Sequence, residues 1–143
     1  MFTVTSKHAL RALAHLANLP EGKTLLGKDL AKMAEIPPNY LSKILWALGS
    51  AGIIDATRGS GGGYRLSRRP EQIRLIDVVE LFDKPRAKHG CFLWENKECS
   101  DGDPCAAHET WRDVGAAYIR FLESTTLADI SVHAHPVSAG EGI

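Results

Sequence analysis

The sequence lacks any long hydrophobic run. None of its 143 residues fall in a stretch approaching the roughly 18 apolar residues that a membrane span needs, so we expect no membrane segment. Residues 1–20 mix charged and polar residues with apolar ones and have no small-residue cleavage site, which predicts a helix rather than a signal peptide. We therefore expect a cytoplasmic protein, in a compartment where thiols stay reduced.

Cysteine is also scarce, with three residues that all lie between positions 91 and 105. An odd number fits a disulfide framework badly, and a chain of this length can bury a core without such cross-links. No C-x-x-C pair is present, and no base with an orienting third group can be recognised beside a cysteine. These absences argue against a disulfide reductase and a catalytic thiol, and we predict that the protein is not an enzyme.

The net charge of zero conceals two halves of opposite sign. Residues 1–69 contain ten Lys and Arg against four Asp and Glu, whereas residues 70–143 contain seven against thirteen. A basic half of this kind is a common footprint of proteins that bind phosphate backbones.

Apolar residues recur at helical spacing through the N-terminal half. They predict helices over 6–18, 24–35 and 36–52, and residues 53–69 then follow the order strand, glycine-rich tip, strand. The tip, "RGSGGGYRL", is not a phosphate-binding P-loop, because the Lys-Ser or Lys-Thr that should follow is missing. Three helices and a hairpin in this order are typical of a winged helix-turn-helix that binds DNA.

The C-terminal half predicts a fourth helix over 75–83, a cysteine-containing loop and a long helix over 108–130. We expect a mainly α fold with a two-stranded β wing. Its expected parts are a DNA-binding domain over 1–83, a cysteine loop over 84–107, the long helix over 108–130 and a flexible tail over 131–143.

The third predicted helix has a face suited to reading DNA. Its apolar positions must face the core, which leaves Asn39, Tyr40, Ser42 and Lys43 exposed near the N-terminal end that recognition helices present to base edges. Asn pairs with adenine, Ser bonds either way, and Lys reaches guanine or phosphate. Arg58, beside the glycine-rich tip, suits a narrow minor groove.

The cysteine loop follows the pattern C-x7-C-x5-C-x2-H, formed by Cys91, Cys99, Cys105 and His108. Structural zinc sites prefer ligands in close pairs, and only the last two residues form one, although a loop of this length can still enclose a single ion. Iron–sulfur clusters tolerate wider spacing, and histidine can replace cysteine on one iron. Spacing alone leaves zinc, a cluster and metal-free redox-sensing thiols open.

The segments "VTSKHALRALAHLA", "NYLSKILWALGSAGII", "RGSGGGYRL" and "CAAHETWRDV" together resemble the IscR/NsrR/RirA family of winged-helix transcription regulators, over about residues 1–130. The resemblance implies a homodimer, paired through the long C-terminal helix, that binds a roughly palindromic double-stranded DNA operator. It places DNA contacts at Asn39, Tyr40, Ser42, Lys43, Arg58 and Gly59, with Ser6 and Lys7 near phosphates.

The resemblance also implies a cofactor. It favours a 2Fe–2S cluster held by Cys91, Cys99, Cys105 and His108, with a 4Fe–4S cluster held by the three cysteines and another ligand as the alternative. Ser42 stands where IscR-like members carry an acidic residue, which predicts a different sequence preference. Two other functions stay open, namely a cluster-free regulator that senses redox state through thiols and a zinc-stabilised interaction module.

Overall fold

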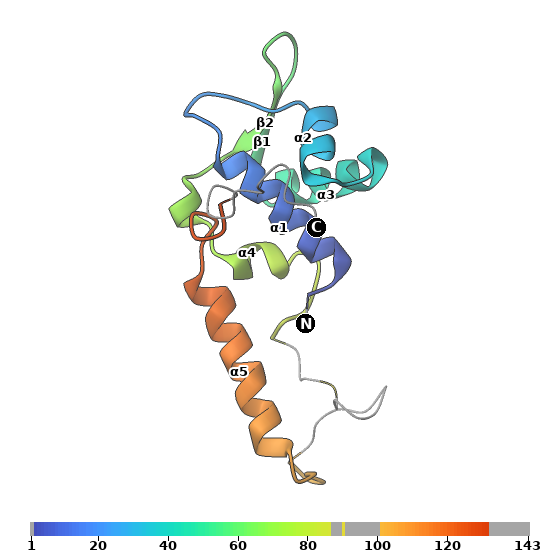
Figure 1. The fold of residues 1–143 in the computed structure, drawn as a ribbon, viewed down its shortest axis with the longest axis vertical. Helices are drawn as coiled ribbons and strands as arrows, with labels where there is room; N and C mark the ends of the chain where they lie inside the picture. Colours follow the sequence, from blue (N-terminus) through green and yellow to red (C-terminus); the bar gives the residue numbers. More distant parts are fainter. Residues whose placement is uncertain (1, 87–89, 91–100, 132–143) are drawn as a thin grey trace, which may run out of the picture.

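The computed structural model describes residues 2–86, 90 and 101–131. Within these ranges the chain forms three helices, a two-stranded hairpin, a short 3-10 helix over Pro70–Gln72 and two further helices (Figure 1). This order confirms the predicted mainly α fold with a two-stranded wing. Two predicted ligands, Cys91 and Cys99, lie outside the described residues, as do the positions of the predicted tail from 132 onward.

The first three helices are α1 (Val4–Ala17), α2 (Gly27–Ala34) and α3 (Pro38–Ser50). The turn between α2 and α3 is short because Glu35 adopts a left-handed conformation with φ of 55°, and Pro38 then starts α3 at a position where its missing N–H costs nothing. All three helices turn apolar side chains into one core. Its fully buried members from these helices include Ala9, Ala12, Leu13, Leu30, Ala34 and Leu48.

The wing consists of β1 (Ile54–Thr57) and β2 (Gly63–Leu66), paired antiparallel and joined by a tip over 58–62. Leu25, which precedes α2, extends this sheet because its N–H and carbonyl pair with the backbone of Tyr64 at 3.0 and 2.7 Å. The wing is therefore hydrogen-bonded, near its tip, to the segment that leads into α2.

Two glycines at the end of the tip are required by their surroundings. A Cβ on Gly62 would lie 2.3 Å from the carbonyl oxygen of Thr57, and one on Gly63 would lie 2.5 Å from that of Leu25. Gly63 also has a φ of 142°, which residues with a side chain rarely adopt. The backbone at Leu25 can thus approach the wing only because Gly63 has no side chain.

The last two helices are α4 (Leu75–Val79) and α5 (His108–Ser124), and α5 extends away from the body of the molecule (Figure 1). Helix α5 ends earlier than the predicted range of 108–130, because Thr125 is extended and the backbone from it onward pairs with the segment before α4. The N–H of Leu127 donates to the carbonyl of Ile73 at 2.9 Å, for example. The described chain contains no helix that is both long and apolar enough to cross a membrane.

Candidate nucleic-acid interface and cysteine site

The outward face of α3 carries three of the predicted DNA contacts. Asn39, Ser42 and Lys43 are all exposed on the side of the helix away from the core, as their spacing predicts. The Ser42 hydroxyl donates to the carbonyl of Pro38 at 3.0 Å, which leaves its oxygen able to accept a further hydrogen bond. This end of α3 offers amide, hydroxyl and ammonium groups to a ligand.

Tyr40, a fourth predicted contact, lies against α1 instead. Its ring packs edge-on against that of His8, with centroids 5.3 Å apart, and its hydroxyl is hydrogen-bonded to the hydroxyl of Thr5. Burial, and then the positive charge of Arg11, lower the pKa of His8, which favours the neutral ring in this contact. Tyr40 is thus an internal contact between α1 and α3.

The wing tip presents a positive charge on a fixed loop. Arg58 is exposed, and Gly59 beside it has a φ of 93° with open space around its Cα. The hydroxyl of Thr24 lies 3.1 Å from the carbonyl oxygens of both Gly61 and Gly62, to which it can donate, so the loop is held from the α2 side. All four charged residues between positions 56 and 69 are arginines.

The start of α1 corrects one sequence-based expectation. Ser6 is fully buried, and its hydroxyl donates to the carboxylate of Asp83 at 2.6 Å, so it cannot contact a phosphate in this conformation. Lys7, the next residue, is exposed and remains available. Sequence reasoning had no signal for the Ser6–Asp83 contact, which joins positions 77 residues apart.

The same carboxylate lies at a junction of three elements. Burial raises the pKa of Asp83, but hydrogen bonds from Ser6 and Thr3 outweigh it and hold that pKa below its usual value. On α5, burial and then the charge of Asp83 raise the pKa of the Tyr118 phenol. The Tyr118 ring packs edge-on against Phe2, so residues from before α1, after α4 and within α5 meet here.

The predicted metal ligands that the structure describes lie at the N-terminal end of α5. Cys105 is exposed, and its carbonyl accepts the N–H of His108 at 3.1 Å. His108 is buried, with Nε2 2.7 Å from Oδ1 of Asp101, and the same oxygen accepts a hydrogen bond from Arg112 at 3.0 Å. A carboxylate that holds one imidazole nitrogen is the usual partner of a metal-binding histidine, which then binds through the other nitrogen.

A further contact brings the beginning of the cysteine segment to the same place. The indole N–H of Trp111 donates to the carbonyl of Gly90, the residue before Cys91, at 3.0 Å. Considering described residues alone, no group of three or more His, Cys, Asp and Glu side chains is arranged to hold a metal ion. Cys105 and His108 are the described members of the predicted ligand set, and this set stays a prediction because its other two members lie outside the described part.

Comparison with known proteins decides the family. The sequence model of the Rrf2 family, described as iron-dependent transcriptional regulator, matches residues 2–133. The chain belongs to the Rrf2 family. Among relatives, the regulator NsrR of Geobacillus kaustophilus is 34% identical over 125 residues, covering 87% of this chain and 85% of the relative. IscR of Aliivibrio salmonicida is 30% identical over 131 residues, covering 91% and 76%.

Solved structures agree with this Rrf2 fold over nearly the whole chain. CymR of B. subtilis, described as the global cysteine regulator, superposes with a TM-score of 0.76 at 24% identity, covering 93% of this chain and 97% of its own. IscR of T. potens gives a TM-score of 0.73 at 22% identity, covering 99% and 93%. The resemblance inferred from the motifs is confirmed, and the Rrf2 protein is a transcriptional regulator rather than an enzyme.

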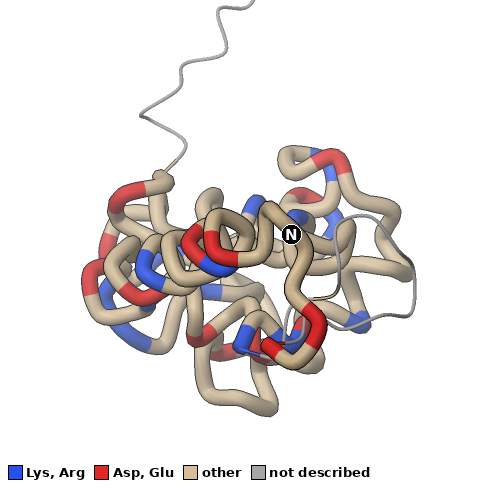
Figure 2. The backbone as a smooth tube through the Cα atoms, turned by 90° about the horizontal axis from the view of Figure 1, so that it is seen from below, with Lys and Arg blue, Asp and Glu red and all other residues tan. Residues whose placement is uncertain are grey.

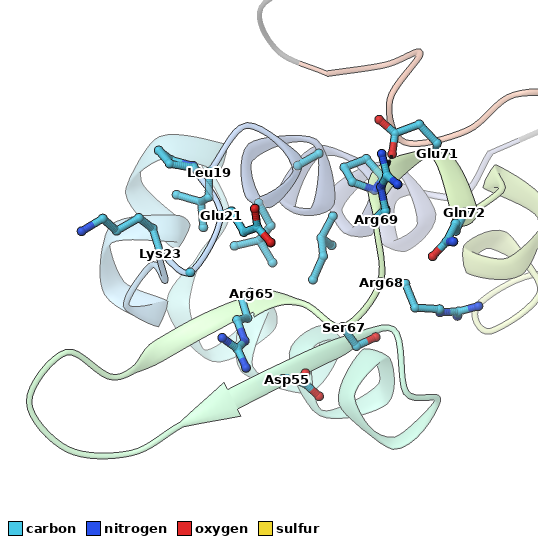
Figure 3. Close-up of a pocket in the computed structure, with 16 residues that line it drawn as sticks. Leu19, Glu21, Lys23, Asp55, Arg65, Ser67, Arg68, Arg69, Glu71 and Gln72 are labelled. Atoms are coloured by element: carbon cyan, nitrogen blue, oxygen red, sulfur yellow. Dashed lines mark ion pairs between the residues drawn. The ribbon is translucent and has the colours of Figure 1, made fainter.

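The Rrf2 chain also contains a groove of about 860 Å³ between the connection after α1 and the outer face of the wing. Figure 3 shows Glu21 and Lys23 on the connection, Asp55 and Arg65 on the hairpin, and Arg69 farther along. Arg65, Arg68 and Arg69, which we expect near the phosphates of bound DNA, line it, but acidic side chains are mixed with them, so it offers no strong field to an anion.

Positive and negative residues are likewise interspersed along the backbone when the molecule of Figure 1 is viewed from below (Figure 2). The concentration of arginines without carboxylates is instead a feature of the hairpin, over positions 56–69. Of these four arginines, Arg65, Arg68 and Arg69 line the groove of mixed charge, and Arg58 at the tip lies outside it.

Proposed function

We propose that this Rrf2 protein is a homodimeric cytoplasmic regulator that reads a roughly palindromic operator and whose operator affinity is set by an iron–sulfur cluster. One observation carries the proposal. The exposed polar end of α3 and the arginine-bearing wing lie toward one end of the molecule. Cys105 and His108 lie toward the opposite end, where α5 begins (Figure 1).

The DNA-reading part follows from the exposed groups. With α3 in the major groove, Asn39 suits adenine and Lys43 suits guanine or a phosphate, while Ser42 can bond to several bases. With the wing along the minor groove, Arg58 enters it and Gly59 lets the backbone come close. Lys7 contributes a phosphate contact.

The proposed cluster ligands are Cys91, Cys99, Cys105 and His108, which suit a 2Fe–2S cluster. A 4Fe–4S cluster on the three cysteines and another ligand is the alternative. When bound, the cluster supplies a centre that gains or loses electrons, at a potential raised by a histidine ligand. Asp101 orients the His108 ring through Nε2 at 2.7 Å.

Pairing of two chains through α5 is supported by an apolar edge on that helix. Val114 and Phe121, seven residues apart on one line of the helix, are 41% and 46% exposed, beside the buried Tyr118 and Leu122. A second α5 could cover this edge, because apolar residues seven positions apart repeat on the same side of a helix.

Coupling between the two ends follows from how α5 is anchored. Its C-terminal end pairs with the segment before α4, and Tyr118 meets the Asp83 junction with α1. A change in the loop that holds Cys105 would therefore shift α5 relative to the partner and alter the distance between the two recognition helices. A dimer reads half-sites at one spacing, so a small rotation forfeits one set of contacts.

Anaerobic purification with ferrous salt and sulfide tests the proposal. We expect visible absorption with bound iron and sulfide, and operator affinities of loaded and cluster-free protein that differ by about five- to 150-fold. Cys105→Ser is expected to abolish the absorption and leave the far-ultraviolet circular dichroism unchanged. Asp103→Asn, at an exposed loop position outside the ligand set, serves as the control and should retain the absorption.

Two results would favour one of the alternative functions over control by a cluster. Zinc without iron or sulfide would favour a zinc-stabilised module, and an affinity that responds to thiol oxidation in metal-free protein would favour a thiol-based regulator. Equal affinity of the loaded and cluster-free forms refutes control by the cluster.

A further inference from the structure

Trp46 is an unusual residue to find on the surface of α3. It is 75% exposed, more than any other large apolar side chain in the described residues. Tryptophan is ordinarily highly buried in a soluble domain, so an exposed one calls for a contact that the isolated chain does not supply.

The position of Trp46 on the helix indicates what that contact is. With about 3.6 residues per turn, positions 39, 43, 46 and 50 lie along one line. This line runs opposite the buried positions Leu41, Leu45 and Leu48. Trp46 therefore continues the same line as Asn39 and Lys43, about one turn beyond the latter, on the face proposed to enter the major groove.

The surroundings of Trp46 are uncharged and largely apolar, with Ser42 and Ser50 as the polar members. It borders a shallow pocket of about 460 Å³ between α3 and the wing, which no charged residue lines. Leu45 and Gly49 of α3 and Ala56 and Tyr64 of the wing contribute to the lining. Trp46 is thus a large apolar group between the polar Ser42 and Ser50 on the outward face of α3.

We propose that Trp46 is a specificity-determining residue that packs against the C5 methyl group of a thymine in the operator. The inference rests on the proposed function, since it requires α3 to lie in the major groove. The thymine methyl is the one apolar group that base pairs present on that edge, and burying it against an aromatic ring distinguishes thymine from the other bases. Lys43, on the same line of α3, and Arg58, at the wing tip, attract through their positive charge the DNA that brings this methyl group.

The test uses the full-length regulator and a duplex selected from a random-sequence library by the wild-type protein. Single thymines in each half-site are then replaced by deoxyuridine, which removes only the methyl group. We expect one such replacement to weaken wild-type binding by about four- to tenfold, as removal of one buried methyl group implies. Trp46→Ala should bind the unmodified duplex more weakly and be indifferent to that replacement.

Two variants separate this contact from other effects. Met33→Ala removes an apolar side chain that is 52% exposed on α2, and it should retain the wild-type response to deoxyuridine. Lys43→Ala should also retain the response, but the slope of log affinity against log salt should fall by about one for each phosphate that Lys43 neutralises. Trp46→Ala should leave that slope unchanged.

The outcomes distinguish the inference from the function on which it rests. If the wild-type protein selects no duplex, the proposed function fails and the inference fails with it. If it selects one but tolerates every deoxyuridine, or if Trp46→Ala responds to deoxyuridine as the wild type does, only the thymine contact is overturned. Full binding by Trp46→Ala would overturn it too.

Discussion

Ser6 is the buried hydroxyl through which α1 contacts the carboxylate of Asp83. Ser6→Ala removes one of the hydrogen bonds that keep the pKa of Asp83 low. We expect it to reduce the free energy of unfolding by about 1.5–3 kcal/mol at neutral pH, as removal of a hydrogen bond to a charged group does. Urea unfolding at fixed protein concentration measures this difference.

The pH dependence has a definite sign. The pKa of Asp83 in the folded chain lies below its unfolded value of about 3.9, so the bond stabilises above that pH and its contribution is lost as pH falls through the folded value. The difference between Ser6→Ala and wild type should therefore shrink below about pH 4. Ser42→Ala, at an exposed position, is the control, and a difference independent of pH would contradict the assignment.

At the same scale, the DNA contacts could be predicted only in part. The helical period places Asn39, Ser42 and Lys43 outside the core, and the structure has them exposed. The same reasoning could not place Tyr40 against α1 or exclude the buried Ser6, because their partners, on α1 and after α4, are distant in sequence.

Among the elements, the wing depends most on a single position. Gly63→Ala would place a Cβ 2.5 Å from the Leu25 carbonyl oxygen and force a backbone with φ of 142° to accept a side chain. We expect loss of the pairing between Leu25 and Tyr64, a melting temperature lowered by several degrees and weaker operator binding. Thermal unfolding and a binding titration measure the two effects.

Gly52→Ala is the matched control for the steric clash that Gly63→Ala creates with the Leu25 carbonyl oxygen. Gly52 also has a positive φ, 74°, but nothing lies within 4 Å of the Cβ it would gain. It should incur only the left-handed strain of about 1–2 kcal/mol, with operator affinity intact in the folded protein. If the two variants bound the operator equally, the shape of the wing would not depend on Gly63.

Helix α5 was predicted in type and start but not in length. The sequence stripe of Trp111, Val114, Tyr118, Phe121 and Leu122 suggests one buried face, yet Val114 and Phe121 are exposed. Periodicity identifies apolar positions, but it cannot tell a face that packs on the chain's own core from one left for another surface.

On the scale of the whole molecule, the exposed edge of α5 predicts the oligomeric state. Phe121→Glu places a charge on the proposed pairing face, so we expect it to convert the dimer to a monomer in sedimentation equilibrium. It should also lower operator affinity, because the two half-sites would be bound independently. Ala116→Glu, on the opposite side of α5, should remain dimeric. A dimer in both variants would rule out this face.

The local pattern by itself determined the order of helices and hairpin, the glycine-rich wing and the outward face of α3. These follow from periodicity and backbone preferences that act over a few residues. Tertiary structure alone decided that Ser6 is buried against Asp83 and that α5 stops at Ser124. Each of these depends on which distant segments pack together, and contacts between distant segments leave no period in the chain.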